Sequence, residues 1–355
     1  MRLGPACLLL LSALGACAPT TGPTALPVEA LVVLDREERS IRLIAVDSTN
    51  VVRTIDLSGT AAKPTVMAVR GTVAVVGFGD LGQVAVVDLA TRRVLSLEPI
   101  QGTGPVAALA ISEAGEVFAA VPTTNDANVS FFNLQTREGG GIRVEGGPQG
   151  FGVIRGSVFV VLGNRQLCYP AVPSCLDLPS WLRSDPRFAT DSIALFGPGN
   201  ASATAAGSDG LLYVLNSGNG GSAEGRLSAV DPVTRKESAS FAGFGLSPLY
   251  LASDGADRLL IASPRELMVF NVREHRVEKG AGAGIPFAQA PRALVTDAFG
   301  RVYVPVGGSC VAGGAPGAVR VFGTDLVERS TIPIGVCPVS AAVTEIPAEY
   351  FHADL

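Results

Sequence analysis

The chain has few of the side chains that enzymes commonly use as acids, bases or metal ligands. Its 355 residues include only two histidines, His275 and His352, and no HExxH, GxSxG, Walker or GxGxxG motif in a fitting context. Lysine and arginine together number 27, against 32 aspartate and glutamate residues. Nucleic-acid-binding domains usually carry a basic excess, so this balance argues against a nucleic-acid partner.

Long segments with the period of a helix are also missing, whereas glycine and proline are abundant. There are 42 glycines and 24 prolines, and 47% of the residues are hydrophobic. This composition is typical of many short strands joined by tight turns. All-β folds of this length often form one domain, so we expect a single all-β unit with an ample core.

The first residues, "MRLGPACLLLLSALGAC", have the pattern of an export signal. Arg2 precedes an apolar run that is too short to span a bilayer as a helix. The run ends in Leu14-Gly15-Ala16-Cys17, which resembles the bacterial lipobox. The resemblance implies cleavage of residues 1–16 and acylation of Cys17. The alternative is an ordinary secretory signal followed by a chance cysteine.

Residues 17–27 would then be a lipidated tether. The segment "APTTGPTALP" has no hydrophobic period and would reach roughly 30 Å in a polyproline conformation. Ala18, rather than aspartate, follows Cys17, so the resemblance does not suggest retention at the inner membrane. We expect the protein in the bacterial cell envelope, anchored to a membrane by lipid.

A repeated unit occupies most of the remaining chain. Its starts are spaced by 41 to 52 residues and fall at Pro64, Pro105, Pro148, Asn200, Pro248, Pro291 and Pro338. Periods of 40 to 50 residues with four short strands are typical of a β-propeller. In most units the third strand ends at an aspartate or asparagine followed by threonine or arginine, as in "VDLATRRV" and "VDPVTRKE". That order suits a type I turn.

The best copy, "GLLYVLNSGNGGSAEGRLSAVDPVTRK" at 210–236, resembles the YVTN-repeat propeller family. Weaker copies cover roughly residues 28–346, and the copy from Pro148 departs most because it lacks the acidic turn. The resemblance implies propeller architecture and says little about chemistry.

The ends of the chain predict how the ring closes. The first unit, from Ala30, has three strands and no proline-led first strand, and Pro338–Ile346 supplies one. A late strand pairing there would cover an open sheet edge. We therefore predict an all-β, seven-bladed β-propeller closed by the C-terminal strand. Blade one comprises 28–57 and 338–346, and residues 347–355 form a C-terminal tail.

Four cysteines fit this layout. If the first strand of each blade is innermost and runs from a top face to a bottom face, Cys168 and Cys175 flank the turn between the third and fourth strands of blade four. Cys310 and Cys337 then both lie in top loops of blade seven. An exported protein can hold such disulfides, so we predict the pairs 168–175 and 310–337. The alternative is four unpaired thiols.

Polar residues in the predicted top loops form a candidate ligand face. They are Asp80, Asn125, Asp126, Asn128, Arg165, Asn216, Asn219 and Arg265. Their oxygens could approach a calcium ion, but the clustered carboxylates of a good site are missing, and we expect no metal or cofactor. The alternative is that these residues simply shape hairpin turns.

An insert at 179–199 forms a candidate partner loop. It carries the only tryptophan and is predicted on the top face, with Trp181, Arg183, Arg187 and Phe188 as anchors. Aromatic and arginine side chains are typical of interface hot spots. The alternative is a loop folded over its own blade.

Two functional classes remain open. The first is an envelope-anchored lipoprotein that acts as a binding or scaffold module through its top-face loops, with an envelope-protein or cell-wall partner. The second is a propeller-type hydrolase or lactonase acting on a small exported substrate, since fold alone does not fix function. The predicted inner strands, such as "TVMAV" and "VAALAI", contain no charge, which favours the first class. We expect a monomer.

Overall fold

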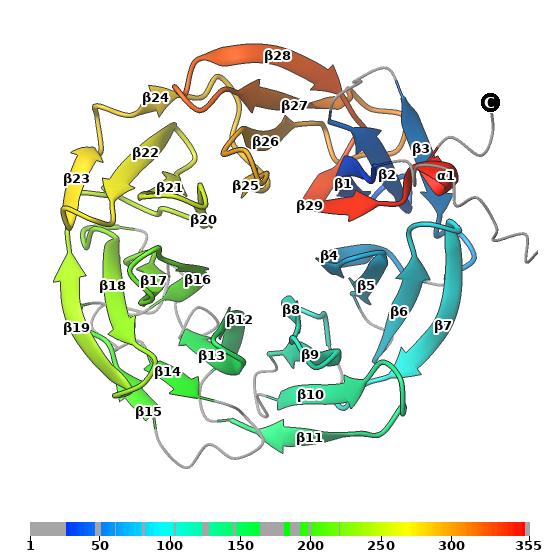
Figure 1. The fold of residues 1–355 in the computed structure, drawn as a ribbon, viewed down its shortest axis with the longest axis horizontal. Coiled ribbons are helices and arrows are strands. Elements are labelled where there is room, and N and C mark those ends of the chain that lie inside the picture. The colour runs from blue at the N-terminus through cyan, green and yellow to red at the C-terminus, as the bar shows by residue number, and fades with distance from the viewer. Residues whose placement is uncertain are drawn as a thin grey trace, which may run out of the picture.

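The computed structural model describes residues 26–46, 51–60, 62–79, 82–102, 104–122, 128–144, 147–163, 181–184, 192–197, 200–219 and 221–351. Within these ranges, six four-stranded sheets and one five-stranded sheet stand around a common axis (Figure 1). The predicted all-β propeller class is therefore confirmed. We number the sheets 1 to 7 in chain order, so that sheet 1 corresponds to predicted blade one.

Sheets 1 to 4 have the following strands, from the innermost outward. Sheet 1 contains β29 (Pro338–Ile346), β1 (Val28–Asp35), β2 (Ser40–Ala45) and β3 (Val52–Asp56). Sheet 2 contains β4 (Pro64–Arg70), β5 (Val73–Phe78), β6 (Gln83–Asp88) and β7 (Arg93–Pro99). Sheet 3 contains β8 (Ala108–Ile111), β9 (Glu116–Val121), β10 (Asn128–Asn133) and β11 (Gly139–Arg143). Sheet 4 contains β12 (Gly147–Ile154), β13 (Ser157–Gly163), β14 (Trp181–Ser184) and β15 (Ser192–Ala194).

Sheets 5 to 7 complete the ring. Sheet 5 contains β16 (Ala201–Ala206), β17 (Leu212–Asn216), β18 (Arg226–Asp231) and β19 (Lys236–Phe241). Sheet 6 contains β20 (Tyr250–Ser253), β21 (Arg258–Ala262), β22 (Glu266–Asn271) and β23 (Arg276–Lys279), and β24 (Ile285–Pro286) also pairs with β22. Sheet 7 contains β25 (Val295–Thr296), β26 (Val302–Gly307), β27 (Gly317–Phe322) and β28 (Glu328–Pro333).

The core lies between the sheets, because the middle strands are apolar on both faces. In β5, "VAVVGF", five of six residues are buried, and β6, "QVAVVD", is buried at its four central positions. Each neighbouring pair of sheets shares a buried cluster, and sheets 7 and 1 share one that includes Leu31, Ile44 and Tyr303. Burial of this apolar surface is the main term that holds the sheets together.

Hydroxyl groups join neighbouring inner strands, which explains why these strands are rich in small and β-branched residues. Thr65 Oγ1 donates to Val106 O at 2.9 Å, and Thr296 Oγ1 donates to Ser253 O at 2.6 Å. Ser340 Oγ in β29 donates to Met67 O in β4 at 3.3 Å. These bonds link the inner part of one sheet to the next sheet around the ring.

Sheet 1 combines the two ends of the described chain. β29 pairs antiparallel with β1, with Val28 opposite Ile346 and Asp35 opposite Pro338. Just before β29, the buried Asp35 accepts a hydrogen bond from Cys337 N through Oδ2 at 2.8 Å. These are the residues that the sequence assigned to a closing strand and its partner.

The predicted Cys310–Cys337 disulfide is present. It joins the loop between β26 and β27 to the residue before β29, so it ties sheet 7 to sheet 1 at the top end. On the chain-entropy model, closing a loop of this length contributes about 3.5 kcal/mol.

Sheet 4 differs from the predicted arrangement. Trp181–Ser184 forms β14, the third strand, in which Trp181 pairs with Leu162 of β13. The tryptophan segment is therefore a strand and not a top-face insert. In the sequence, Cys168 and Cys175 both precede this third strand, so they do not flank the turn between the third and fourth strands as predicted. The pattern failed here because this repeat has no acidic turn to mark the end of its third strand. Arg165, Cys168, Cys175, Arg187 and Phe188 lie outside the described residues.

The predicted C-terminal tail also contributes to the fold. It contains a short helix, α1 (Ala348–Phe351), whose Phe351 is 1% exposed and packs in the core between sheets 1 and 2. Arg53 Nε donates to Phe351 O at 3.2 Å. The propeller thus extends to residue 351, because one large aromatic side chain finds a buried place beyond the last strand.

Candidate functional site

The ring has two ends, which the strand directions define. We call the end that contains Cys337 and Pro338 the top, and the end that contains Val28 and Ile346 the bottom. Turns between the first and second strands and between the third and fourth strands lie at the bottom. Loops between the second and third strands, and connections between sheets, lie at the top.

Two predicted ligand residues, Asn216 and Asn219, shape one top loop of sheet 5. Asn216 ends β17 and is fully buried. Asn219 Oδ1 accepts hydrogen bonds from Gly221 N and Ala223 N, both at 2.9 Å. The Asn219 oxygen is thus engaged by its own loop, as in an Asx turn.

Arg265 is the predicted residue that stays available. It lies exposed between β21 and β22, and no hydrogen bond or ion pair joins its side chain to another described residue. Asn128 begins β10 and pairs with Val121 and Arg143. Asp80, Asn125 and Asp126 lie outside the described residues, as does Cys17.

The structure adds two apolar residues to the top end. Leu246 is exposed in the connection from sheet 5 to sheet 6, and Val311 is exposed between β26 and β27 of sheet 7. Each is an aliphatic residue in a glycine-rich segment, "GFGLSP" and "SCVAGG". An aliphatic residue in a predicted glycine-rich loop can indicate an exposed contact residue. A search restricted to polar loop residues does not find it.

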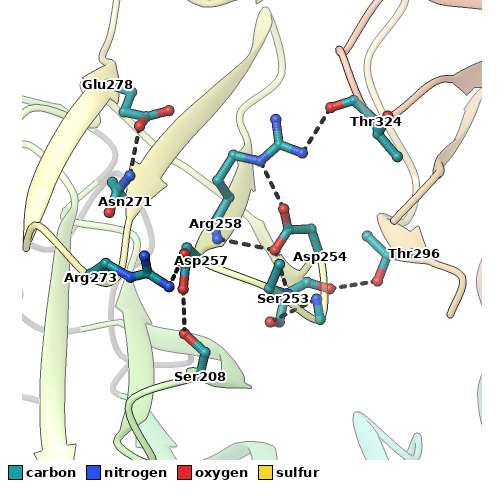
Figure 2. A network of polar contacts seen from close by, with 12 residues as sticks. Ser208, Ser253, Asp254, Asp257, Arg258, Asn271, Arg273, Glu278, Thr296 and Thr324 are labelled. Carbon is teal, nitrogen blue, oxygen red and sulfur yellow. Dashed lines mark hydrogen bonds and ion pairs between the residues drawn. The ribbon is translucent and has the colours of Figure 1, made fainter. Parts of the chain in front are cut away.

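Buried carboxylates organise the bottom end. Asp254 Oδ1 accepts from Ala256 N at 2.9 Å and from Arg258 N at 3.0 Å, while Oδ2 accepts from Arg258 Nε at 2.7 Å (Figure 2). Arg258 Nη2 then donates to Thr324 O of sheet 7 at 2.8 Å. The carboxylate shapes its turn and orients an arginine toward the next sheet.

Sheet 7 repeats this arrangement toward sheet 1. Asp297 accepts from Phe299 N and Arg301 N, both at 2.9 Å, and from Arg301 Nε. Arg301 Nη2 contacts Glu29 Oε2 at 3.1 Å. Glu29 lies near the start of β1, so this contact joins sheet 7 to sheet 1.

Other polar pairs at the bottom also cross between sheets. Ser208 Oγ of sheet 5 donates to Asp257 Oδ1 of sheet 6 at 3.2 Å, and Asp257 also pairs with Arg273 (Figure 2). His275, in the bottom turn between β22 and β23, lies with its Nε2 3.2 Å from Asp209 Oδ2 of sheet 5. These pairs therefore serve contacts between sheets.

Two tyrosines bound to these aspartates are shielded from water. Burial, followed by the hydrogen bond to Asp209, raises the pKa of Tyr213 well above its ordinary value. Burial, followed by the charge of Asp297, raises the pKa of Tyr303 in the same direction. A raised folded-state pKa gives stability that is present below the unfolded pKa of about 10 and is lost as pH rises above it.

We therefore expect a late step in an alkaline absorbance titration of the 5 tyrosines. Tyr213 and Tyr303 should ionise only when the fold is lost, and Tyr213→Phe and Tyr303→Phe should each remove one residue from that step. Reversible ionisation of all tyrosines together near pH 10, with the circular dichroism unchanged, would contradict the assignment.

Two clefts lie between neighbouring sheets. One, of about 270 Å³, separates sheets 7 and 1 and is lined mainly by apolar residues, with Arg301 and Arg329 beside them. The other, of about 320 Å³, lies between sheets 2 and 3 and is lined by Phe131, Gln101 and the Glu98–Arg137 ion pair, among others.

In the described part of the chain, no group of three or more His, Cys, Asp or Glu side chains is placed to hold a metal ion. No helix in the same ranges is both long and apolar enough to cross a membrane.

Comparison with known proteins supports the fold. No family model matches the chain, and no curated protein is similar to it in sequence. A functionally unknown protein from Desulfotomaculum acetoxidans DSM 771 is similar in structure, with a TM-score of 0.67, 11% identity, and coverage of 89% of this chain and 99% of that chain. Kuenenia stuttgartiensis hydrazine synthase is also similar, with a TM-score of 0.60, 13% identity, and coverage of 80% and 95%. At these identities the likeness shows a shared propeller fold.

Proposed function

We propose that the chain is an envelope-anchored β-propeller lipoprotein that binds another envelope protein through its top-end loops. The observation that carries the proposal is the exposed set Leu246, Arg265 and Val311, which we call the top patch. Its members lie at the same end of sheets 5 to 7. Exposed apolar and arginine side chains are the kind of residues that anchor protein interfaces.

The contacts at the bottom end support a scaffold rather than a reaction site. Asp254 and Asp297 are buried and fully engaged by backbone N–H groups and arginines. These bonds join sheets, and a rigid ring is what a loop-borne binding surface needs.

We further propose that the ring is a YVTN-like propeller of seven blades, closed by β29. The pairing of β29 with β1, the buried cluster between sheets 7 and 1, and the Cys310–Cys337 disulfide support closure at this junction. The lipobox-like Leu14-Gly15-Ala16-Cys17 supports an anchor at Cys17. Mass spectrometry of the mature N-terminus should find acylated Cys17, and an unmodified residue there would overturn the anchor.

The binding surface can be tested by photo-crosslinking in intact cells. A photoreactive residue at Val311 or Leu246 should yield the same crosslinked envelope protein, and Arg265→Glu should abolish that product. Val233, an exposed valine in a bottom turn of sheet 5, is the matched control position. Equal crosslinking from Val233, or products that survive Arg265→Glu unchanged, would argue against a specific top-end partner.

A further inference from the structure

Large apolar side chains gather at the bottom end of sheets 1 and 7. Five of them are exposed there: Leu26 by 85%, Val52 by 38%, Phe299 by 69%, Val327 by 52% and Tyr350 by 43%. We call these residues the bottom patch. Exposed apolar groups concentrated in one region usually mark an interaction surface, whereas scattered ones need no explanation.

Hydrogen bonds and strand pairing bring the segments of this patch together. Ala298 N donates to Glu29 Oε1 at 3.1 Å, which places the Phe299 turn beside the start of β1. The bond from Arg53 Nε to Phe351 O places α1, with Tyr350, beside the start of β3, where Val52 lies. Leu26 precedes Val28, which pairs with Ile346 at the same end.

The composition of the patch suits the interface of a bilayer. It combines two aromatic and three aliphatic side chains, and the Arg301 guanidinium lies 5.4 Å from the centre of the Phe299 ring. Aromatic rings are favoured at the boundary between head groups and acyl chains, and arginine can keep its charge at the head-group level.

The position of the patch selects the bilayer as its occupant. The described chain begins at Leu26, only nine residues after Cys17, and such a segment reaches roughly 30 Å at most when extended. A lipid on Cys17 would therefore hold the bottom end, and not the top, close to the membrane. We propose that the bottom patch inserts into the head-group region of the membrane in which the Cys17 lipid is anchored. The top patch then faces away from that membrane. This inference rests on the proposed anchor.

Depth-dependent quenching tests the inference on the full-length mature protein. Phe299→Trp and Val311→Trp place an indole at opposite ends of β26 in the same sheet, at positions of similar exposure. Each protein is reconstituted in phosphatidylcholine vesicles with or without brominated acyl chains, and the signal of Trp181 in the parent is subtracted. We expect quenching at position 299 and none at 311.

A second pair of variants separates the patch from the anchor. Adding Val327→Ser and Tyr350→Ser to Phe299→Trp should abolish most of the quenching, whereas adding Leu246→Ser should leave it unchanged. Acylation of Cys17 is checked on the same samples. Acylated protein without quenching at 299, or with equal quenching at 311, overturns the patch and leaves the anchor standing. Quenching at 299 without acylation upholds the patch and overturns the anchor.

Discussion

A chain that ends at Cys337 is expected to lose its cooperative thermal melt and to aggregate. Removing residues 338–355 takes away β29, which pairs with all eight residues of β1. It exposes an apolar sheet edge that includes Val32 and Leu34, both fully buried in the intact protein. A typical folded domain is only 5–15 kcal/mol more stable than its unfolded state, so the loss of a whole strand is expected to abolish the cooperative fold. Circular dichroism melts and size-exclusion chromatography measure both effects.

Shorter truncations should give graded results. Deleting 352–355 leaves the buried Phe351 in place and should hardly change the melt. Phe351→Ala should lower the free energy of unfolding by about 3 kcal/mol, since burial and cavity effects add for a large aromatic side chain. The matched control is Tyr350→Ala, an exposed neighbour in α1. A cooperative melt for the chain ending at Cys337 that equals the parent's would show that β29 does not hold the ring.

Repetition made most of the fold predictable from the sequence. Each sheet is formed by one copy of the repeat. The clear copy at 210–236 therefore predicts the strand order of the weaker copies that align with it. Turn residues fixed the strand ends: Asp231 Oδ1 accepts from Val233 N at 2.8 Å, as the expected type I turn requires. The Cys310–Cys337 pair was predictable because the strand directions place both residues at the same end of one blade and an exported protein can hold disulfides.

Local patterns could not predict features that depend on single tertiary contacts. In sheet 4 the acidic residue that marks the turn after the third strand is missing. The pattern therefore predicts a loop at Trp181, although this segment forms β14. Phe351 looked like part of a free tail because its burial depends on a space between sheets 1 and 2 that no periodicity reveals. Asn216 has the residue type of a ligand, but it ends β17, the second strand of sheet 5, and is fully buried. The exposed apolar residues of the two patches could not be predicted, because the sequence pattern marks a segment as a loop without showing which of its side chains are exposed at the surface.

The second large effect is expected at the junction of sheets 7 and 1. Asp297→Ala should lower the free energy of unfolding by about 3 kcal/mol, because it leaves the buried Tyr303 hydroxyl, a partly buried arginine and two backbone N–H groups without their acceptor. The carboxylate accepts from two backbone N–H groups, from Arg301 Nε, and from Tyr303 Oη at 3.0 Å. Denaturant unfolding followed by circular dichroism gives the change directly.

The control is Asp325→Ala in another bottom turn of the same sheet. Asp325 accepts from Val327 N at 3.1 Å and pairs with Arg329, but its side chain is half exposed, so water can replace what the substitution removes. Glu29→Gln removes the charge that Arg301 meets in sheet 1 while keeping the shape of the side chain. If Asp297 acts as the link between the two sheets, the effects of Asp297→Ala and Glu29→Gln should be less than additive, because both act through Arg301. Strict additivity would mean that Asp297 stabilises only its own turn.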